Sequence, residues 1–241
     1  MSIDALSIGR LEQDPSEEQL MTSRKNPFFF LLGGLLLALL IAPLTVENFP
    51  KISGFMLTGT LLVSVLSLAA SKRVFIAAWL LVAAKVVLDI VAIVYPEVSV
   101  HVVEAIIMFA FFILATVFAF QRVLEDEYVD INRIAGAISI YMLIGLIWTS
   151  LYFFLSLLDP QSFNGLSDTS SAALKLHDTI YMDLLYYSYV TLSTLGYGEI
   201  TPASRAAQSL SYLEAICGIM YVAVLVSALV GSYGNRRVAQ S

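Results

Sequence analysis

The sequence predicts an all-α membrane protein with six transmembrane helices, plus a shorter re-entrant helix and the loop that follows it. Three observations predict this class. Of the 241 residues, 59% are hydrophobic and only 13% are charged, whereas soluble domains contain about 25% charged residues. Six apolar segments approach or exceed the roughly 20 residues that a helix needs to cross a bilayer. Finally, the basic residues divide unevenly between the two sides that these segments define.

The apolar segments follow one another along the chain with short polar connections. We expect transmembrane helices at about 27–45, 54–70, 74–95, 101–121, 134–158 and 206–233, and the shorter helix near 179–193. The second segment is the shortest of the six. A long acidic N-terminus precedes the first segment, so that segment does not have the pattern of a cleaved signal peptide.

The basic residues predict the orientation of these helices. With the N-terminus inside, nine of them are cytoplasmic: Arg10, Arg24, Lys25, Lys72, Arg73, Arg122, Arg133, Arg236 and Arg237. Only Lys51, Lys175 and Arg205 fall outside, and Lys85 lies within a span. This bias follows the positive-inside rule. We therefore expect a multi-pass protein of a plasma or inner membrane, with both termini cytoplasmic and the loop at about 159–178 outside.

Charged residues also occur inside the third and fourth segments. Lys85 and Asp89 are four residues apart, on one helix face, and Glu104 near the outer end of the fourth segment could join them. Charges within a membrane are costly and usually pair. A structural ion pair between helices, which we favour, or a sensing or ligand site would explain them. We expect both histidines, His101 and His177, on the outer side and exposed to solvent.

The loop after the short helix has the most specific chemistry. Successive backbone carbonyls can point at one axis only if the backbone alternates between left- and right-handed conformations. The left-handed conformation costs about 1–2 kcal/mol per residue for most side chains, and glycine escapes that cost. Gly196 and Gly198 stand at alternate positions in a Thr-Leu-Gly-Tyr-Gly run. Rings of such carbonyls can replace the hydration shell of a potassium ion, and the Thr194 hydroxyl could add another ring.

Residues 186–202 resemble the pore loop of tetrameric potassium channels, and the resemblance extends over roughly the last hundred residues. It is carried by the Thr-Leu-Ser-Thr run before the loop, the acid and proline after it, and the apolar helices on both sides. Leu195, Ser193 and Glu199 depart from the usual Val or Ile, Thr and Asp, but none removes a carbonyl. The resemblance implies a selectivity filter that binds K⁺ as the permeant ion at Thr194, Leu195, Gly196, Tyr197 and Gly198.

The resemblance also implies residues that support the filter. Tyr186 and Tyr187 occupy positions where the family often has paired tryptophans, and they would form an aromatic cuff. Glu199 is placed to accept a hydrogen bond from one of them. Asp178 and Asp183 would lie at the start of the pore helix, as a cap and in its first turns, where negative charge is favourable.

The last apolar segment would be the inner helix. Gly218 aligns with the family's hinge glycine, and pore-lining positions follow it at three- and four-residue steps: Ile219, Val222, Val226 and Val230. The alternative is that these side chains face lipid or other helices. Glu214 lies mid-helix, and we expect it to be buried, with Tyr152, Thr149 or a pore-helix hydroxyl as its partner.

These observations divide the chain into five parts. They are a cytoplasmic polar N-terminus at 1–26, a four-helix region at 27–122, a cytoplasmic linker at 123–133, a pore domain at 134–235 and a cytoplasmic tail at 236–241. The fourth segment contains no Arg or Lys, so it lacks the repeated charge of a voltage sensor. The short ends lead us to expect no nucleotide- or calcium-binding gating domain.

The predicted function is a homotetrameric potassium channel without steep voltage gating, because one filter strand per chain cannot surround an ion. It is not an enzyme, and we expect no cofactor, no nucleic-acid partner and no small-molecule substrate. Two alternatives remain open. A weakly selective cation channel would result if Leu195 and Glu199 loosened the filter. A secondary transporter or membrane scaffold would instead use the charged residues of the third and fourth segments, although no internal repeat supports a transporter.

Overall fold

The structure is a computed structural model that describes residues 27–46, 72–94, 98–125, 131–167 and 173–238. It is mostly helical. The helices are α2 (Pro27–Val46), α4 (Lys72–Val94), α5 (Val98–Glu125), α6 (Ile131–Leu158), α7 (Ala173–Leu192) and α8 (Arg205–Val238). Two short strands, β1 (Phe163–Asn164) and β2 (Thr201–Pro202), pair in antiparallel orientation. Within the described residues α2, α5, α6 and α8 are long and apolar enough to cross a membrane, as expected for an all-α multi-pass membrane protein.

Helix α8 continues to Val238, into the expected tail at 236–241. The other helix bounds agree with the expected segments to within a few residues, with two exceptions. The expected linker at 123–133 is shorter than predicted, because α5 continues to Glu125 and α6 begins at Ile131. The short helix begins at Ala173 rather than near 179. The expected second span at 54–70 and residues 1–26 lie outside the described residues.

Helix α6 is the central element of the bundle. It packs against α2, α5, α7 and α8, and half of its span is buried. Small or branched apolar side chains on its buried faces, such as Ala135, Ile140 and Leu143, meet aromatic side chains of α2 and α5, including Phe28 and Phe112. The region at 27–122 and the region at 134–235 therefore share one hydrophobic core.

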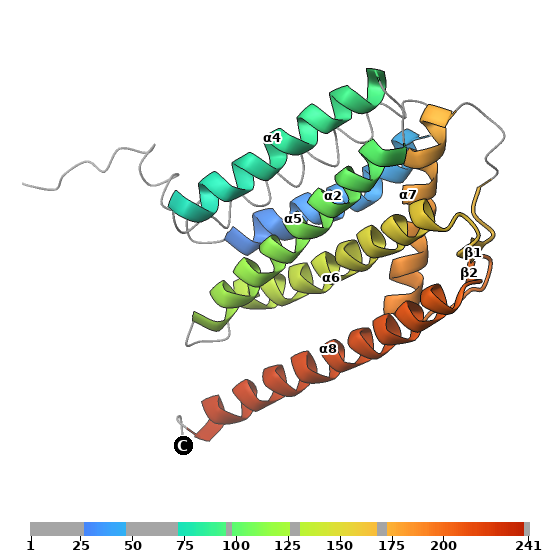
Figure 1. Cartoon of the computed structure of the whole chain (residues 1–241). Coiled ribbons are helices and arrows are strands. Elements are labelled where there is room, and N and C mark those ends of the chain that lie inside the picture. Colours follow the sequence, from blue (N-terminus) through green and yellow to red (C-terminus); the bar gives the residue numbers. More distant parts are fainter. Residues whose placement is uncertain (1–26, 47–71, 95–97, 126–130, 168–172, 239–241) are drawn as a thin grey trace, which may run out of the picture.

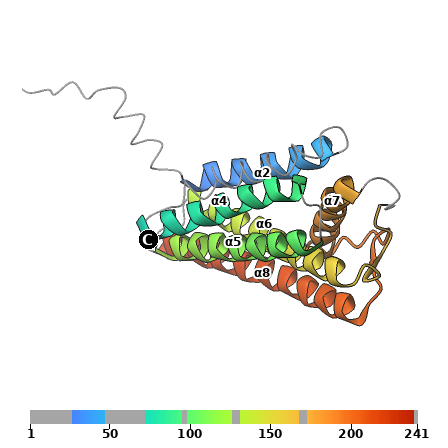
Figure 2. The same ribbon diagram turned by 45° about the horizontal axis from the view of Figure 1, so that its top comes forward.

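The remaining helices place α7 and both strands at one end of the bundle. Figures 1 and 2 show the long helices running along one another, with α7 beside the strands and the far end of α8 at the opposite end. Only 11% of the α8 span is buried. Its large apolar side chains, among them Leu213, Ile216 and Met220, are more than 45% exposed in the single chain. Such a face requires lipid or other subunits to cover it.

The longer α7 corrects the expectation for its acidic residues. Asp178 and Asp183 both lie inside the helix, so neither is at its first turn. The Asp183 carboxylate instead accepts a hydrogen bond from the backbone N–H of Ser167, at 2.7 Å. It therefore ties the outer loop to α7. The side chain of Asp178 lies outside the described residues.

Candidate functional site

The predicted filter begins where α7 ends. Helix α7 ends at Leu192, as the sequence predicts, and the next backbone N–H groups turn back onto its last carbonyls. The N–H of Ser193 donates to the Tyr189 carbonyl at 3.1 Å, and that of Leu195 donates to the Val190 carbonyl at 2.9 Å. The N–H of Gly196 also donates to Val190, at 3.3 Å. These bonds fix the first half of the loop to the end of α7.

The loop backbone alternates in hand. The φ angles of Thr194, Gly196 and Gly198 are 59°, 57° and 93°, whereas Leu195 and Tyr197 between them have no positive φ. The sequence predicts this alternation from the two glycines. It does not predict that Thr194 shares the left-handed conformation, which is costly for a residue with a Cβ. Five consecutive residues therefore have the backbone pattern that directs carbonyls to one side.

The loop is open on one side in the single chain. Leu195 and Tyr197 are 55% and 66% exposed, and a Cβ added at Gly196 or Gly198 would meet no atom within 4 Å. The constraint at these two glycines is thus backbone conformation rather than space. A single chain therefore presents this loop without enclosing it.

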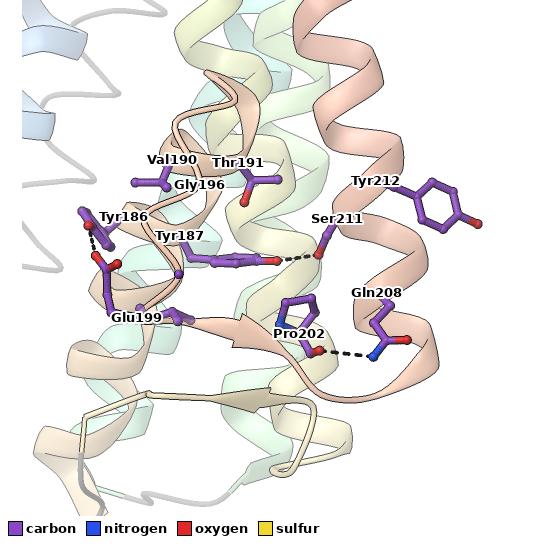
Figure 3. A pocket seen from close by; sticks show the side chains of 12 residues that line it. Tyr186, Tyr187, Val190, Thr191, Gly196, Glu199, Pro202, Gln208, Ser211 and Tyr212 are labelled. Atoms are coloured by element: carbon purple, nitrogen blue, oxygen red, sulfur yellow. Dashed lines mark hydrogen bonds between the residues drawn. The ribbon is translucent and has the colours of Figure 1, made fainter.

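Two neighbouring tyrosines of α7 bond to different elements: Tyr186 to the residue after the loop and Tyr187 to α8 (Figure 3). The Tyr186 hydroxyl donates a hydrogen bond to the Glu199 carboxylate, which confirms the predicted pairing. Tyr187 points the other way, and its hydroxyl lies 2.6 Å from the Ser211 hydroxyl of α8. A pocket of about 400 Å³ lies between the loop, α7 and α8.

The loop between α6 and α7 packs against the residues that follow Gly198, a contact that the sequence does not predict. Gly165 has a φ of 82°, and a Cβ there would lie 2.0 Å from the Glu199 carbonyl oxygen. Beside it, the Ser162 carbonyl accepts a hydrogen bond from the Ala203 N–H at 2.8 Å. Glycine is therefore required at 165, both for the backbone and for the close approach.

Glu214 of α8 faces α6 and α7 and is completely buried. One carboxylate oxygen accepts from the Tyr152 hydroxyl of α6 at 2.5 Å. The other accepts from the Ser188 hydroxyl of α7 at 2.6 Å, and that hydroxyl also lies 2.8 Å from the Gly145 carbonyl of α6. The structure confirms that Glu214 is buried and that Tyr152 and a hydroxyl of α7 are its partners. Thr149, the other candidate, instead donates to the Gly145 carbonyl at 2.8 Å.

The expected hinge residue has a packing role in the structure. A Cβ added at Gly218 would lie 2.1 Å from the Leu192 carbonyl oxygen, so α8 can approach the end of α7 only with glycine at this position. Below it, the expected pore-lining side chains of Ile219, Val222 and Val226 are 58%, 46% and 52% exposed. The side chain of Val230 lies outside the described residues.

Charged residues of α4 and α5 form one cluster. The Lys85 ammonium pairs with both Asp89 and Glu104, as the sequence suggests. The His101 Nδ1 lies 3.3 Å from the Glu104 carboxylate. His101 is only 8% exposed, so the expectation that it faces solvent is wrong. Its position on the first turn of α5 places it beside Glu104, three residues later. The side chain of His177 lies outside the described residues.

Part of the chain is similar to known proteins. Residues 165–233 match the family described as "Ion channel". A two pore potassium channel c of Oryza sativa subsp. japonica is 46% identical over 48 residues, covering 20% of this chain and 10% of that protein. The inward rectifier potassium channel Kirbac3.1 of Paramagnetospirillum magnetotacticum is 27% identical over 106 residues, covering 44% and 33%.

The family match and both relatives are channels, which agrees with the resemblance to potassium channels that the sequence shows. The chain spans no more than a third of the length of either relative. No solved structure matches the chain significantly. The matched residues include the loop at 194–198, Glu214 and Gly218, so the similarity and the geometry concern the same part of the molecule.

Proposed function

We propose that the chain is one subunit of a homotetrameric, potassium-selective channel that conducts passively. In this proposal six helices span a plasma or inner membrane, both termini are cytoplasmic, and α7 with its loop forms a re-entrant pore segment. K⁺ is the permeant ion, and the proposal requires no cofactor. The ion-channel family match and the potassium-channel relatives support this assignment.

The alternating backbone of the loop carries the proposal. Left-handed φ angles at Thr194, Gly196 and Gly198 are what a row of inward carbonyls requires, and carbonyl rings are the ligands that replace the hydration shell of K⁺. The proposed K⁺ ligands are the oxygens of Thr194, Leu195, Gly196, Tyr197 and Gly198. The open side of the loop and the exposed face of α8 support assembly of several copies around one axis.

The proposal also assigns how the pore closes. In the tetramer Ile219, Val222, Val226 and Val230 line the inner cavity, with the constriction at Val226 or Val230. Rings of apolar side chains can narrow a pore until water leaves it. The fourth span, α5, has no Arg or Lys before Arg122 near its end, so we expect open probability to depend only shallowly on voltage.

Ion flux from proteoliposomes tests the function. Wild-type protein should release K⁺ and retain Na⁺. Gly196→Ala should abolish K⁺ release, because a Cβ disfavours the left-handed φ of 57° at that position. Gly33→Ala in α2 is the matched control, since a Cβ there meets nothing within 4 Å, and it should conduct as wild type does.

The same assay separates the alternatives. Equal release of Na⁺ and K⁺ by the wild type would support the weakly selective cation channel. Transport that survives Gly196→Ala would contradict conduction through the filter, and it would favour a transporter that uses the cluster of Lys85, Asp89 and Glu104.

A further inference from the structure

Helix α8 contacts the pore helix at successive turns, and one of these contacts is a shared buried carboxylate. The two helices run in the same direction, so their contacts advance together along both sequences: Ser211 with Tyr187, Glu214 with Ser188, and Gly218 with Leu192. The last of the three, between Gly218 and Leu192, involves the backbone carbonyl of the residue that ends α7. Helix α8 therefore contacts the pore helix at the level from which the filter emerges.

The middle contact is chemically different from the other two. Glu214 has no exposed surface, and each of its carboxylate oxygens accepts from a different helix, Tyr152 on α6 and Ser188 on α7. The Tyr152 ring is held at 5.2 Å from the ring of Tyr187 and 5.5 Å from that of Phe163, which fixes its hydroxyl. An apolar side chain could fill this position without the cost of desolvating a carboxylate. Close packing alone therefore does not explain the residue.

A short path joins Glu214 to the filter backbone. Ser188 is followed by Tyr189 and Val190, whose carbonyls accept the N–H groups of Ser193, Leu195 and Gly196. Glu214 thus binds Ser188, and the next two residues, Tyr189 and Val190, supply the carbonyls that hold the first half of the loop. A displacement of α8 at Glu214 must either move these carbonyls or break the bond to Ser188.

We propose that Glu214 is a positioning residue that couples the inner helix to the filter. By binding Ser188 while held by Tyr152, it keeps the end of α7 in the register that the conducting loop requires. A movement of α8 that weakens the Ser188 bond then destabilises the conducting loop. This inference rests on the proposed potassium conduction and adds to it a link between the inner helix and the filter.

Single-channel recording of Ser188→Ala tests the proposal with the least disturbance. The change removes the link from Glu214 to α7, together with the bond from the same hydroxyl to the Gly145 carbonyl of α6, and leaves the bond between Glu214 and Tyr152. We expect it to shift the ratio of open to closed time on the order of tenfold, the equivalent of one lost hydrogen bond. Ser139→Ala is the matched control, because that fully buried hydroxyl bonds within its own helix, at 2.8 Å from the Ala135 carbonyl. Its open-to-closed ratio should equal that of the wild type.

A second set of variants separates coupling from stability. Glu214→Leu removes the acceptor of the Tyr152 hydroxyl, whereas the Ser188 hydroxyl keeps the Gly145 carbonyl as an acceptor at 2.8 Å. The variant should therefore lower the melting temperature of the assembly and also change gating. Adding Tyr152→Phe and Ser188→Ala removes both hydroxyls, and replacing all partners by apolar groups is close to neutral for stability. The triple variant should therefore recover the melting temperature but keep the altered open-to-closed ratio.

Two results would overturn the proposal. Gating of Ser188→Ala that matches the wild type would show that the Ser188 bond transmits nothing. If the triple variant recovered both the wild-type open-to-closed ratio and the wild-type melting temperature, the role of Glu214 would be purely structural. All variants should keep the wild-type reversal potential. A wild type without a potassium-selective current would instead contradict the proposed function, whatever the variants do.

Discussion

At the scale of single residues, the two ends of the loop at 194–198 are held in different ways. The inner end depends on backbone bonds to the carbonyls of Tyr189 and Val190. The outer end depends on side chains, through the bond from Tyr186 to Glu199, and on the close contact with Gly165. Both partners of the side-chain bond can be changed without altering the backbone, which makes the outer end accessible to experiment.

We expect Tyr186→Phe and Glu199→Gln each to loosen the outer end of the filter and to change the rate of inactivation. Phe removes the donor, and Gln replaces the charged acceptor by a weaker one. Because both changes remove the same contact, the double variant should be no more affected than the stronger single variant. Inactivation rates from recordings under constant drive measure this. Additive effects of the two changes would show that the residues act separately.

At the scale of elements, the approach of α8 to the end of α7 decides which residue position 218 can hold. Alignment with the channel family suggests a hinge at Gly218, and that role stays a prediction. The structure adds an independent requirement, because the Leu192 carbonyl occupies the space that a Cβ would need. A hinge and a close contact predict different consequences for a substitution.

Gly218→Ala should push α8 away from α7 and lower the thermal stability of the assembly. Forcing an extra methyl group into a packed contact costs about 1–3 kcal/mol. It should also reduce open probability, since the contact lies where the filter begins. Gly33→Ala is again the control, with no atom near the added Cβ. If Gly218→Ala changed gating but left the melting temperature at the wild-type value, glycine would be needed for bending and not for packing.

The lower part of α8 contains the proposed constriction. Val226 is 52% exposed in the single chain, so it is available to line a pore. Val226→Ser should raise the resting open probability, because a hydroxyl ring lets water enter a constriction that an apolar ring keeps dry. Single-channel recording at rest measures the effect. Unchanged occupancy of the open state would place the barrier elsewhere, most simply at the filter.

At the scale of the whole molecule, long apolar segments made the helices predictable, and the alternate glycines made the loop predictable. Features with weaker sequence signals could not be predicted. Strands of two residues, such as β1 and β2, have no periodicity to detect, and their partners are far apart in the sequence. The burial of His101 depends on α4 packing beside α5, and the bond of Asp183 to Ser167 depends on how the outer loop folds back. Single-sequence patterns contain neither kind of information.

The same limits apply to the site. The partners of Glu214 could be narrowed to a few hydroxyls because a buried carboxylate needs donors, but choosing among them required the helix positions. Thr194 could not be recognised as left-handed, because its side chain predicts the opposite. The proposed selectivity for potassium rests on the loop backbone, so selectivity is the property that tests the proposal most directly.

The most direct test is the reversal potential of the reconstituted wild-type protein, with potassium on one side of the bilayer and sodium on the other. Carbonyl rings at residues 194–198 should favour potassium, so the current should reverse far from zero, towards the potassium equilibrium potential. A reversal potential near zero under these gradients would contradict the central claim.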